Sequence, residues 1–340
     1  MSSSTSSSRR KRRRRISFGF LGFLILFAAA EWFVFRNLDF YANEYRSPVG
    51  QLAELDYSFR HSRPDRVTIA ILGDSTSKDA LHPDLLAAAS GRSADNIFNF
   101  SISGGKAFDI YRTYHKYSDQ LPELKEAIIV VNEHQLNDYN MENDEMYRFY
   151  ARLQDRIPIM NKDNYGELTL GWVSKAFDMR TLWSKMVRSY LKGTLPKKTL
   201  ADVYKPGGLR AETEKPEKGL TPAYAEERAD SWLGQYAPHG LQTDSLEALL
   251  RDLNDRGVRI VMVQLPRSQL FEETVRRKYP TEQQEYLDIV AGLAKKFGAE
   301  FTVLSNKGLT LEEHFRDTNH VNSKGAAIVS GEVAERWLGK

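Results

Sequence analysis

The sequence predicts an α/β protein, a three-layer sandwich in which helices cover both faces of a five-stranded parallel sheet. Short apolar runs that suit buried strands occur at 67–72, 96–100, 127–132, 258–265 and 300–304. Segments with a helical spacing of apolar residues separate or follow them, at 79–90, 108–119, 244–256, 282–297 and 323–337. Because parallel neighbours are joined by a crossover that is usually a helix, this alternation predicts a parallel sheet.

The N-terminal segment predicts a membrane anchor. Residues 16–35 are almost wholly apolar and reach the ~20 residues that a helix needs to cross a bilayer. Seven consecutive basic residues precede them, at 9–15. Positive residues stay on the cytoplasmic side, so we expect a disordered cytoplasmic tail at 1–15, a single transmembrane helix at 16–36, and a periplasmic or extracellular body.

A cleaved signal peptide is the main alternative to an anchor, since Ala28-Ala29-Ala30 resembles a cleavage site. The retained anchor is favoured because residues 32–35 prolong the apolar stretch. Glu31 is the one charge in this stretch and lies near its outer end, where Trp32 and Arg36 suit the membrane interface. A buried core helix or a nuclear-localisation signal explains only one half of the pattern.

The charge distribution argues against a nucleic-acid partner. The chain has 48 Lys and Arg and 45 Asp and Glu, but seven of the basic residues lie at 9–15, so the body carries a net charge of −4. A mildly acidic body does not suit a polyanion. The absence of cysteine excludes disulfides and thiolate metal sites.

Two segments lie outside the strand–helix alternation. Residues 37–64 are mixed and polar, so we expect a linker with a short helix near 49–57. Residues 139–243 contain no convincing strand and far exceed an ordinary connection. They are expected to be an insertion beside the active face of a catalytic domain at 65–338. Its first half is expected to be helical as far as Tyr190 and its second half to be loop-like, including 205–218.

The first strand ends at Gly73-Asp74-Ser75, and a serine just past a buried parallel strand lies where α/β folds place reacting groups. Such a serine needs a base, and the base needs a third group to hold its tautomer. Before the last predicted helix, Asp317 and His320 supply a carboxylate and an imidazole. The order Ser…Asp…His predicts Ser75 as nucleophile, His320 as base and Asp317 as its orienting group.

A structural role for the last pair is the alternative: Asp317 would then cap the final helix. A zinc site would need a third ligand, and none lies close to Asp317 and His320 in the sequence. No nucleotide-binding motif occurs either. We therefore expect no metal and no dissociable cofactor.

Two further polar blocks follow predicted strands. The block 99–105 contains Gly104, where a glycine lets backbone N–H groups approach an oxyanion; a simple tight turn is the alternative. After the third strand come Asn132, at the strand end, and Asn137, in an Asn-Asp dipeptide. His134 lies between them and is a rival base, although a hydrogen-bonded loop residue explains it more simply.

Together these blocks resemble the SGNH (GDSL-type) hydrolase superfamily, over about 65–140 and 245–338. The resemblance implies a catalytic triad of Ser75, Asp317 and His320 and an oxyanion hole that includes Gly104 and an asparagine. The third block lacks the glycine of the family's Gly-x-Asn-Asp pattern, and we assign Asn132 rather than Asn137 to the oxyanion hole.

The same triad serves esterases and O-acyltransferases, which differ in whether water or a sugar hydroxyl releases the acyl group from Ser75. The anchor and the run 261–267 are similar to membrane-associated SGNH-like proteins that O-acetylate exopolysaccharide or cell-wall polymers, and the insertion would shield an acyl-enzyme from water. We expect an acyl donor, a glycan acceptor and, by resemblance, a multi-span membrane acyltransferase as partner. The alternatives are an esterase of acylated glycans or lipids and a non-catalytic scaffold in a polymer-secretion complex.

Overall fold

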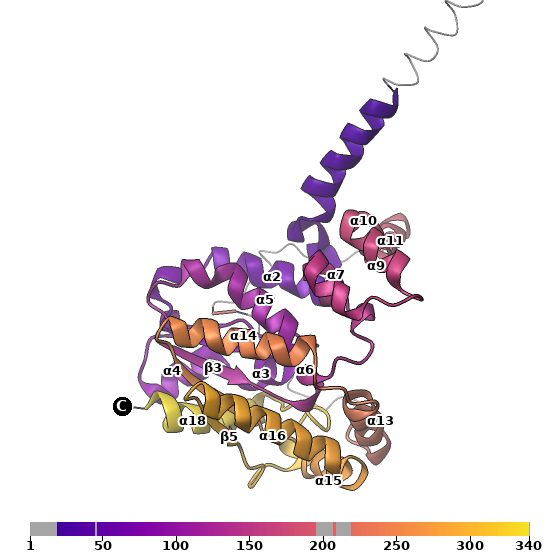
Figure 1. The fold of residues 1–340 in the computed structure, drawn as a ribbon. Helices are drawn as coiled ribbons and strands as arrows, with labels where there is room; N and C mark the ends of the chain where they lie inside the picture. The colour runs from indigo at the N-terminus through magenta and orange to yellow at the C-terminus, as the bar shows by residue number, and fades with distance from the viewer. Residues whose placement is uncertain (1–18, 45, 195–206, 209–218, 340) are drawn as a thin grey trace, which may run out of the picture.

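A five-stranded, all-parallel sheet with the order β2-β1-β3-β4-β5 forms the centre of the computed structural model, which describes residues 19–44, 46–194, 207–208 and 219–339 (Figure 1). The strands are β1 (Ile69–Leu72), β2 (Ile97–Asn99), β3 (Glu126–Val130), β4 (Arg259–Gln264) and β5 (Glu300–Val303). The predicted α/β class and the parallel sheet are therefore confirmed. Each strand lies within three residues of the predicted bounds.

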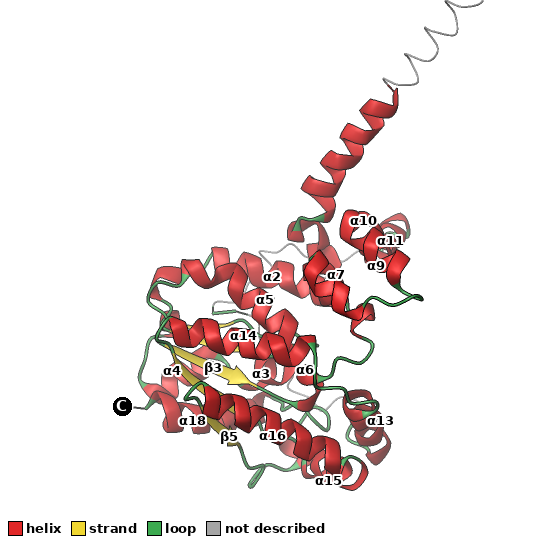
Figure 2. Cartoon of the chain, in the orientation of Figure 1, coloured by secondary structure: helices red, strands yellow, loops and turns green. Residues whose placement is uncertain are grey.

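Helices cover both faces of the sheet (Figure 2). Along β1, Ala70 and Leu72 pack on one face with α2, α5, α14 and α16, and Ile69 and Ile71 pack on the other with α4 and α18. This two-residue alternation follows from the pleat of a strand, and because both faces are covered the strand reads as continuously apolar. The bounds of these helices are α2 Pro48–Arg60, α4 Pro83–Ser90, α5 Ala107–Tyr117, α14 Leu241–Asp255, α16 Pro280–Lys296 and α18 Ser323–Val333.

The predicted helix 79–90 is two helices, α3 (Ser75–Ala80) and α4, separated at Leu81 and His82. The residue before a proline disfavours helical backbone, so Pro83 starts a new helix instead of continuing the first. A helix that was not predicted, α15 (Gln269–Lys278), follows β4 and packs on α13 (Pro222–Leu233).

The segment 37–64 is not a linker, which corrects the prediction. The helix expected near 49–57 extends over all of α2, and a 3₁₀ turn (Leu38–Glu44) precedes it. Both pack into the core through fully buried side chains such as Tyr41, Leu55 and Phe59. The polar residues misled the prediction because they occupy the outer face of an amphipathic helix whose inner face covers the sheet.

The described part of the insertion is helical. It contains α7 (Glu145–Tyr150), α8 (Leu153–Arg156), α9 (Tyr165–Val173), α10 (Lys175–Asp178), α11 (Arg180–Leu191) and α13, with short α6 (Glu133–Leu136) before it and α17 (Leu311–His314) near the C-terminus. The predicted basic tail at 1–15, the first residues of the predicted anchor and most of the loop predicted at 205–218 lie outside the described residues.

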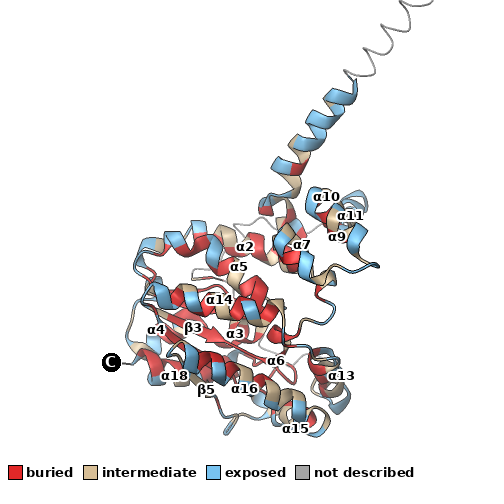
Figure 3. Ribbon diagram, viewed as in Figure 1, coloured by how far each residue is buried: buried red, intermediate tan, exposed pale blue. Residues whose placement is uncertain are grey.

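The N-terminal helix, Gly19–Phe35, projects from the body and is largely exposed along its length (Figure 3). Among the residues that the structure describes, no single helix is long and apolar enough to cross a membrane. Gly19–Phe35 and Leu38–Glu44 satisfy the length and composition together, with a bend of 61° between them.

Candidate active site

Ser75, His320 and Asp317 form a continuous chain of hydrogen bonds, although Ser75 and His320 are 245 residues apart. The Ser75 Oγ lies 2.7 Å from His320 Nε2. The opposite ring nitrogen, Nδ1, lies 2.9 Å from Asp317 Oδ2 and 3.0 Å from Oδ1. This arrangement matches a nucleophile, a base and a group that orients the base.

Ser75 is the first residue of α3 and lies directly beyond the carboxyl end of β1. Asp74 caps that helix: its Oδ1 accepts hydrogen bonds from the Thr76 backbone N–H at 2.9 Å and from the Thr76 hydroxyl at 2.6 Å. The cap sets the direction in which α3 leaves the strand, and thereby the position of the Ser75 side chain. Asp74 in the Gly-Asp-Ser motif therefore positions the Ser75 hydroxyl.

Gly73 is required by close packing at this turn. A Cβ atom at this position would overlap the Ser77 Oγ and would lie 3.0 Å from the Val130 Cβ. Ser77 in turn donates to Ser101 at 2.6 Å, which links the turn after β1 to the block after β2. A larger residue at 73 would push α3, and Ser75 with it, away from the sheet.

Asp317 and His320 belong to a short loop that is closed by an antiparallel bridge between Phe315 and Val321. Asp317 Oδ1 also accepts the backbone N–H groups of Asn319 and His320, at 3.0 and 2.8 Å. The carboxylate is thus held by its own loop before it binds the imidazole.

The alternative role for Asp317 does not apply, because another residue caps the final helix. The Asn322 side chain accepts the backbone N–H groups of Lys324 and Gly325 and is the N-cap of α18. Asp317 is therefore free to serve the imidazole.

Asp317 is kept ionised by its surroundings. Burial opposes the ionised form, but the hydrogen bond and charge of His320, the Asn319 backbone N–H and the Arg316 charge outweigh burial and hold the pKa of Asp317 below its usual value. An ionised Asp317 accepts the Nδ1–H of His320, which leaves Nε2 as the atom facing Ser75.

Gly104 lies in the turn after β2 with φ +74°, a left-handed conformation that glycine adopts without strain. A Cβ there would meet no atom within 4 Å, so the space beside Gly104 is open. The neighbouring Ser103 binds Lys78 of α3 through its hydroxyl, and this bond ties the turn to the helix that starts at Ser75. Ser75 itself has a backbone N–H without an intrahelical partner, as the first residue of a helix must.

The two candidate asparagines have different surroundings. Asn132 donates from Nδ2 to Asp74 Oδ2 at 2.7 Å, which places it beside the residue that precedes Ser75. Asn137 instead donates to the Trp232 carbonyl and accepts from Ala237, and so holds the connection between α13 and α14. Of the two, Asn132 is the one that the structure brings to the Gly73–Ser75 turn.

His134 stacks against Trp232 with ring centroids 5.8 Å apart. Burial and the nearby Lys106 charge lower the pKa of His134, and the ring also interacts with the backbone of Gly104. These contacts describe a loop histidine that supports the turn at Gly104, whereas the Ser75 hydroxyl donates its hydrogen bond to His320.

The structure also identifies contacts that the sequence analysis missed. Ser268, in the turn after β4, donates from its hydroxyl to the Thr318 carbonyl at 2.6 Å and so holds the Asp317–His320 loop. Arg316 pairs with the buried Asp79 of α3 at 2.8 Å. Polar residues that follow parallel strands meet at one edge of the sheet, and the sequence analysis used this for the first three strands. The same reasoning applied to β4 would have identified Ser268.

Arg267 lies next to Ser268 and is almost fully buried. It pairs with Glu133 at 2.5 Å and with Glu272 at 2.7 Å. Since Glu133 follows Asn132, this pair connects the turns after β3 and β4.

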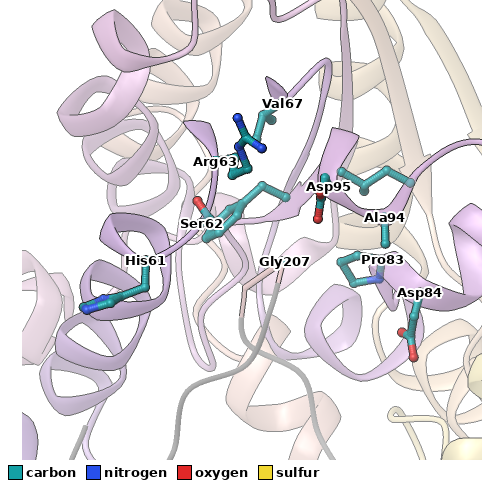
Figure 4. A pocket seen from close by; sticks show the side chains of 11 residues that line it. His61, Ser62, Arg63, Val67, Pro83, Asp84, Ala94, Asp95 and Gly207 are labelled. Carbon is teal, nitrogen blue, oxygen red and sulfur yellow. The ribbon is translucent and has the colours of Figure 1, made fainter. Parts of the chain in front are cut away.

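One cavity of the molecule lies apart from Ser75, Asp317 and His320. A cavity of about 260 Å³ lies beside edge strand β2 (Figure 4) and contains no triad residue. It is lined by His61, Ser62, Arg63, Val67, Pro83, Asp84, Ala94, Asp95, Ile97, Phe98 and Gly207. Within the described ranges, no cluster of three or more His, Asp or Glu side chains is placed to hold a metal ion.

Comparison of the sequence with protein-family models and with curated proteins finds no match. The fold and the site together define an α/β protein with a hydrogen-bonded Ser–His–Asp chain at the carboxyl edge of a parallel sheet.

Proposed function

We propose that this protein is a serine-dependent acyl-transfer enzyme that O-acetylates an extracytoplasmic polysaccharide or cell-wall polymer. The observation that carries the proposal is the Ser75–His320–Asp317 chain, with Ser75 Oγ 2.7 Å from His320 Nε2. A serine hydroxyl is a weak nucleophile until a base accepts its proton, and this geometry supplies the base.

In the first half-reaction Ser75 Oγ attacks the acyl carbonyl carbon of the donor while its proton passes to His320 Nε2. The tetrahedral intermediate then breaks the bond to the leaving group, which takes that proton from His320 and departs. Acyl-Ser75 remains. In the second half-reaction an acceptor hydroxyl gives its proton to His320 Nε2 and attacks the ester carbon. The bond between the acyl carbon and Ser75 Oγ then breaks, and His320 returns the proton to Ser75 Oγ.

The negative oxygen of the intermediate needs donors that are in place before the reaction. We assign the backbone N–H groups of Ser75 and Gly104 and the amide of Asn132 to this role. Asn132 has two amide hydrogens and uses one on Asp74. One such donor is worth ~3–4 kcal/mol of transition-state stabilisation in enzymes of this kind.

The positions of these groups support an SGNH-like assignment. From β1 the chain adds β2 on one side of the sheet and then β3, β4 and β5 on the other, so the topological switch point lies between β1 and β3. Ligands of open α/β sheets bind outside the carboxyl ends of the strands at such a point. Ser75 follows β1 and Asn132 follows β3. Hydrogen bonds join the blocks of Ser75, Asn132 and His320 at this one edge, and the Ser77–Ser101 hydrogen bond joins the block after β2 to them.

Transfer to a glycan is favoured over hydrolysis by two features outside the triad. The apolar stretch 16–36, of which the structure describes the helix Gly19–Phe35 and Arg36, would hold the protein as a single-pass membrane protein, with its N-terminus cytoplasmic and the triad on the outer side. The 139–243 insertion adds helices that a bare α/β sheet does not need. By resemblance, a multi-span membrane acyltransferase would supply the acyl group.

The test uses the full chain in detergent with a fluorophosphonate probe and with p-nitrophenyl acetate. We expect one labelled residue, Ser75, and loss of labelling in Ser75→Ala and His320→Ala variants, with the rate falling by on the order of 10³-fold or more. Ser90→Ala serves as the matched control, because Ser90 bonds only within α4, to the Leu86 carbonyl. Its labelling should equal that of the unaltered chain.

The acceptor is identified in the same experiment. Acetyl that persists on Ser75 in water and is released by added oligosaccharide supports a transferase, whereas fast release in water identifies an esterase. A chain whose Ser75 takes neither probe would favour the scaffold interpretation and contradict the proposal.

A further inference from the structure

The N-terminal helix is attached to the insertion by a buried carboxylate. Glu31 is 7% exposed, and its two oxygens accept hydrogen bonds from the Ser174 hydroxyl at 2.5 Å and from the backbone N–H groups of Lys175 and Ala176 at 2.7 and 3.0 Å. These donors form the start of α10, where a negative charge is favourable. Glu31, the one charge in the apolar stretch, therefore fixes that stretch to the insertion.

A second contact lies next to the first. The ring of Phe35 packs against Trp183 of α11, with centroids 5.9 Å apart, and Lys185 of α11 pairs with Glu44 at 2.8 Å. The helices α9 to α11 thus lie beside the end of the N-terminal helix that is nearest to the body (Figure 1).

Large apolar side chains around these two contacts are exposed. Trp32 and Phe33 directly follow Glu31, and Trp172 and Val173 directly precede Ser174. Val187, Tyr190 and Leu191 continue the face of α11 that begins at Trp183. We call these seven side chains the apolar surface. Leu191 is 77% exposed and Tyr190 71%, values far from those of core residues. Large apolar side chains that stay exposed on segments held side by side by such contacts indicate a binding surface.

The charge of α11 indicates what binds there. Residues 180–194 contain four basic residues, Arg180, Lys185, Arg188 and Lys192, and no acidic residue. Arg188 and Lys192 form no ion pair with any residue that the structure describes. Arg188 directly follows Val187, and Lys192 directly follows Leu191. A helix with an aromatic and aliphatic face beside basic residues is typical of segments that lie in the boundary between headgroups and acyl chains.

We infer that the apolar surface lies in the outer leaflet of the membrane, with Arg188 and Lys192 bound to anionic phospholipid headgroups. This inference rests on the proposed insertion of the N-terminal helix, which brings the surface to the bilayer. Glu31 holds α9 to α11 against the helix, so the body docks on the lipid in one orientation instead of rotating about the anchor. The triad is then kept at a constant distance from the membrane.

The chain has no cysteine, so single labels can be introduced without other changes. A polarity-sensitive dye is attached at Leu191→Cys in the apolar surface, at Leu26→Cys in the N-terminal helix and at Ile328→Cys on α18. Ile328 is the matched control, an exposed aliphatic residue on a helix of the α4 face of the sheet. Each full-length variant is reconstituted into vesicles of phosphatidylcholine with phosphatidylglycerol that carry nitroxide-labelled acyl chains.

We expect strong nitroxide quenching at positions 26 and 191 and severalfold weaker quenching at 328. If position 26 is quenched but position 191 is quenched no more than position 328, the inference is overturned and the anchor stands. Absence of quenching at both 26 and 191 overturns the anchor as well. Shielding of position 191 that appears only in native membranes, and not in the vesicles, assigns the surface to a membrane protein instead and also overturns the inference.

The headgroup assignment has its own test. Replacing Arg188 and Lys192 with glutamine should weaken quenching at position 191 in vesicles that contain phosphatidylglycerol and leave position 26 unchanged. Equal quenching at position 191 with and without the two basic residues would overturn the role of anionic lipid.

Discussion

At the scale of single residues, the candidate site depends on groups whose protonation is set by their neighbours. Asp317 is held ionised by His320, by two backbone N–H groups and by Arg316, all within one short loop. Its carboxylate does not need to take up a proton during the reaction; it has to hold the imidazole in one tautomer. This distinguishes an orienting role from a general-acid role.

Asp317→Asn tests that role. An asparagine keeps an oxygen for the backbone N–H groups of Asn319 and His320, so the loop should survive, but it cannot favour the Nδ1–H tautomer as a carboxylate does. We expect kcat to fall by roughly 10³–10⁴-fold with little change in KM. The measurement is turnover of p-nitrophenyl acetate, together with circular dichroism as a check of folding. A variant that retains more than a tenth of the activity would contradict the assignment.

Asp138, which follows Asn137, also has an altered pKa. Burial, opposed by the Gln242 backbone N–H and the Lys106 charge, raises the pKa of Asp138 from 3.8 to about 6. The folded protein then holds this proton more tightly than the unfolded chain does. The stability contribution is therefore largest at low pH and is lost as pH rises from about 4 to about 6.

Asp138→Asn removes this penalty at neutral pH. The amide oxygen can still accept the Gln242 N–H, which donates to Asp138 Oδ1 at 3.0 Å. We expect a gain of about 1–3 kcal/mol in the free energy of unfolding at pH 7 and almost none at pH 4, by urea denaturation. The exposed Asp65 provides a control, because Asp65→Asn should change neither value. An equal shift at both pH values would exclude the protonation mechanism.

At the scale of elements, the triad is assembled by a bridge between α3 and the loop before α18. Asp79 is 2% exposed and lies four residues after Ser75, and Arg316 immediately precedes Asp317. Their ion pair at 2.8 Å therefore joins the helix of the nucleophile to the loop of the base. Burial raises the pKa of Asp79, while His320 and Arg316 oppose that rise.

Breaking this bridge should affect stability and activity together. Arg316→Gln leaves a buried carboxylate without its cation, and we expect a loss of about 3–5 kcal/mol in unfolding free energy and a lower kcat. In the double variant Asp79→Asn/Arg316→Gln, part of the stability should return. Arg336→Gln is a matched control, because it breaks an exposed pair with Glu332 that is worth under ~1 kcal/mol. Strict additivity of the two substitutions would show that the pair does not couple the elements.

At the scale of the whole molecule, Glu31 connects the N-terminal helix to the insertion. In Glu31→Ala the backbone N–H groups of Lys175 and Ala176 lose their acceptor, so their hydrogen exchange should accelerate, with the helix cap losing about 0.5–2 kcal/mol. Exchange of the β3 amides should stay unchanged. Glu123→Ala, at an exposed position, is the control and should alter neither region. Unchanged exchange in α10 would show that the helix is not fixed in this way.

Much of the core and site was predictable because it depends on short-range patterns. Strands β1 to β5 were found from apolar runs, and Ser75, Asp317 and His320 from motifs at the ends of elements. The segment 37–64 was wrongly predicted to be a linker, because periodicity shows that a helix has an apolar face but not which element covers that face. Helix α15 was not predicted because it lies next to none of the motifs that the sequence analysis used.

By itself the sequence determined the order of strands and helices along the chain and the residue types available at each strand end. These properties are local, since propensity and periodicity act over a few residues. Only the tertiary structure decided that Ser75 meets His320 across 245 residues, that Asn132 and not Asn137 reaches Asp74, and that Glu31 binds α10. The motif resemblance led us to expect Ser75 beside His320 and Asn132 near the site, but whether these contacts form depends on how the sheet orders its strands and on which helices cover it. A local sequence pattern does not fix either.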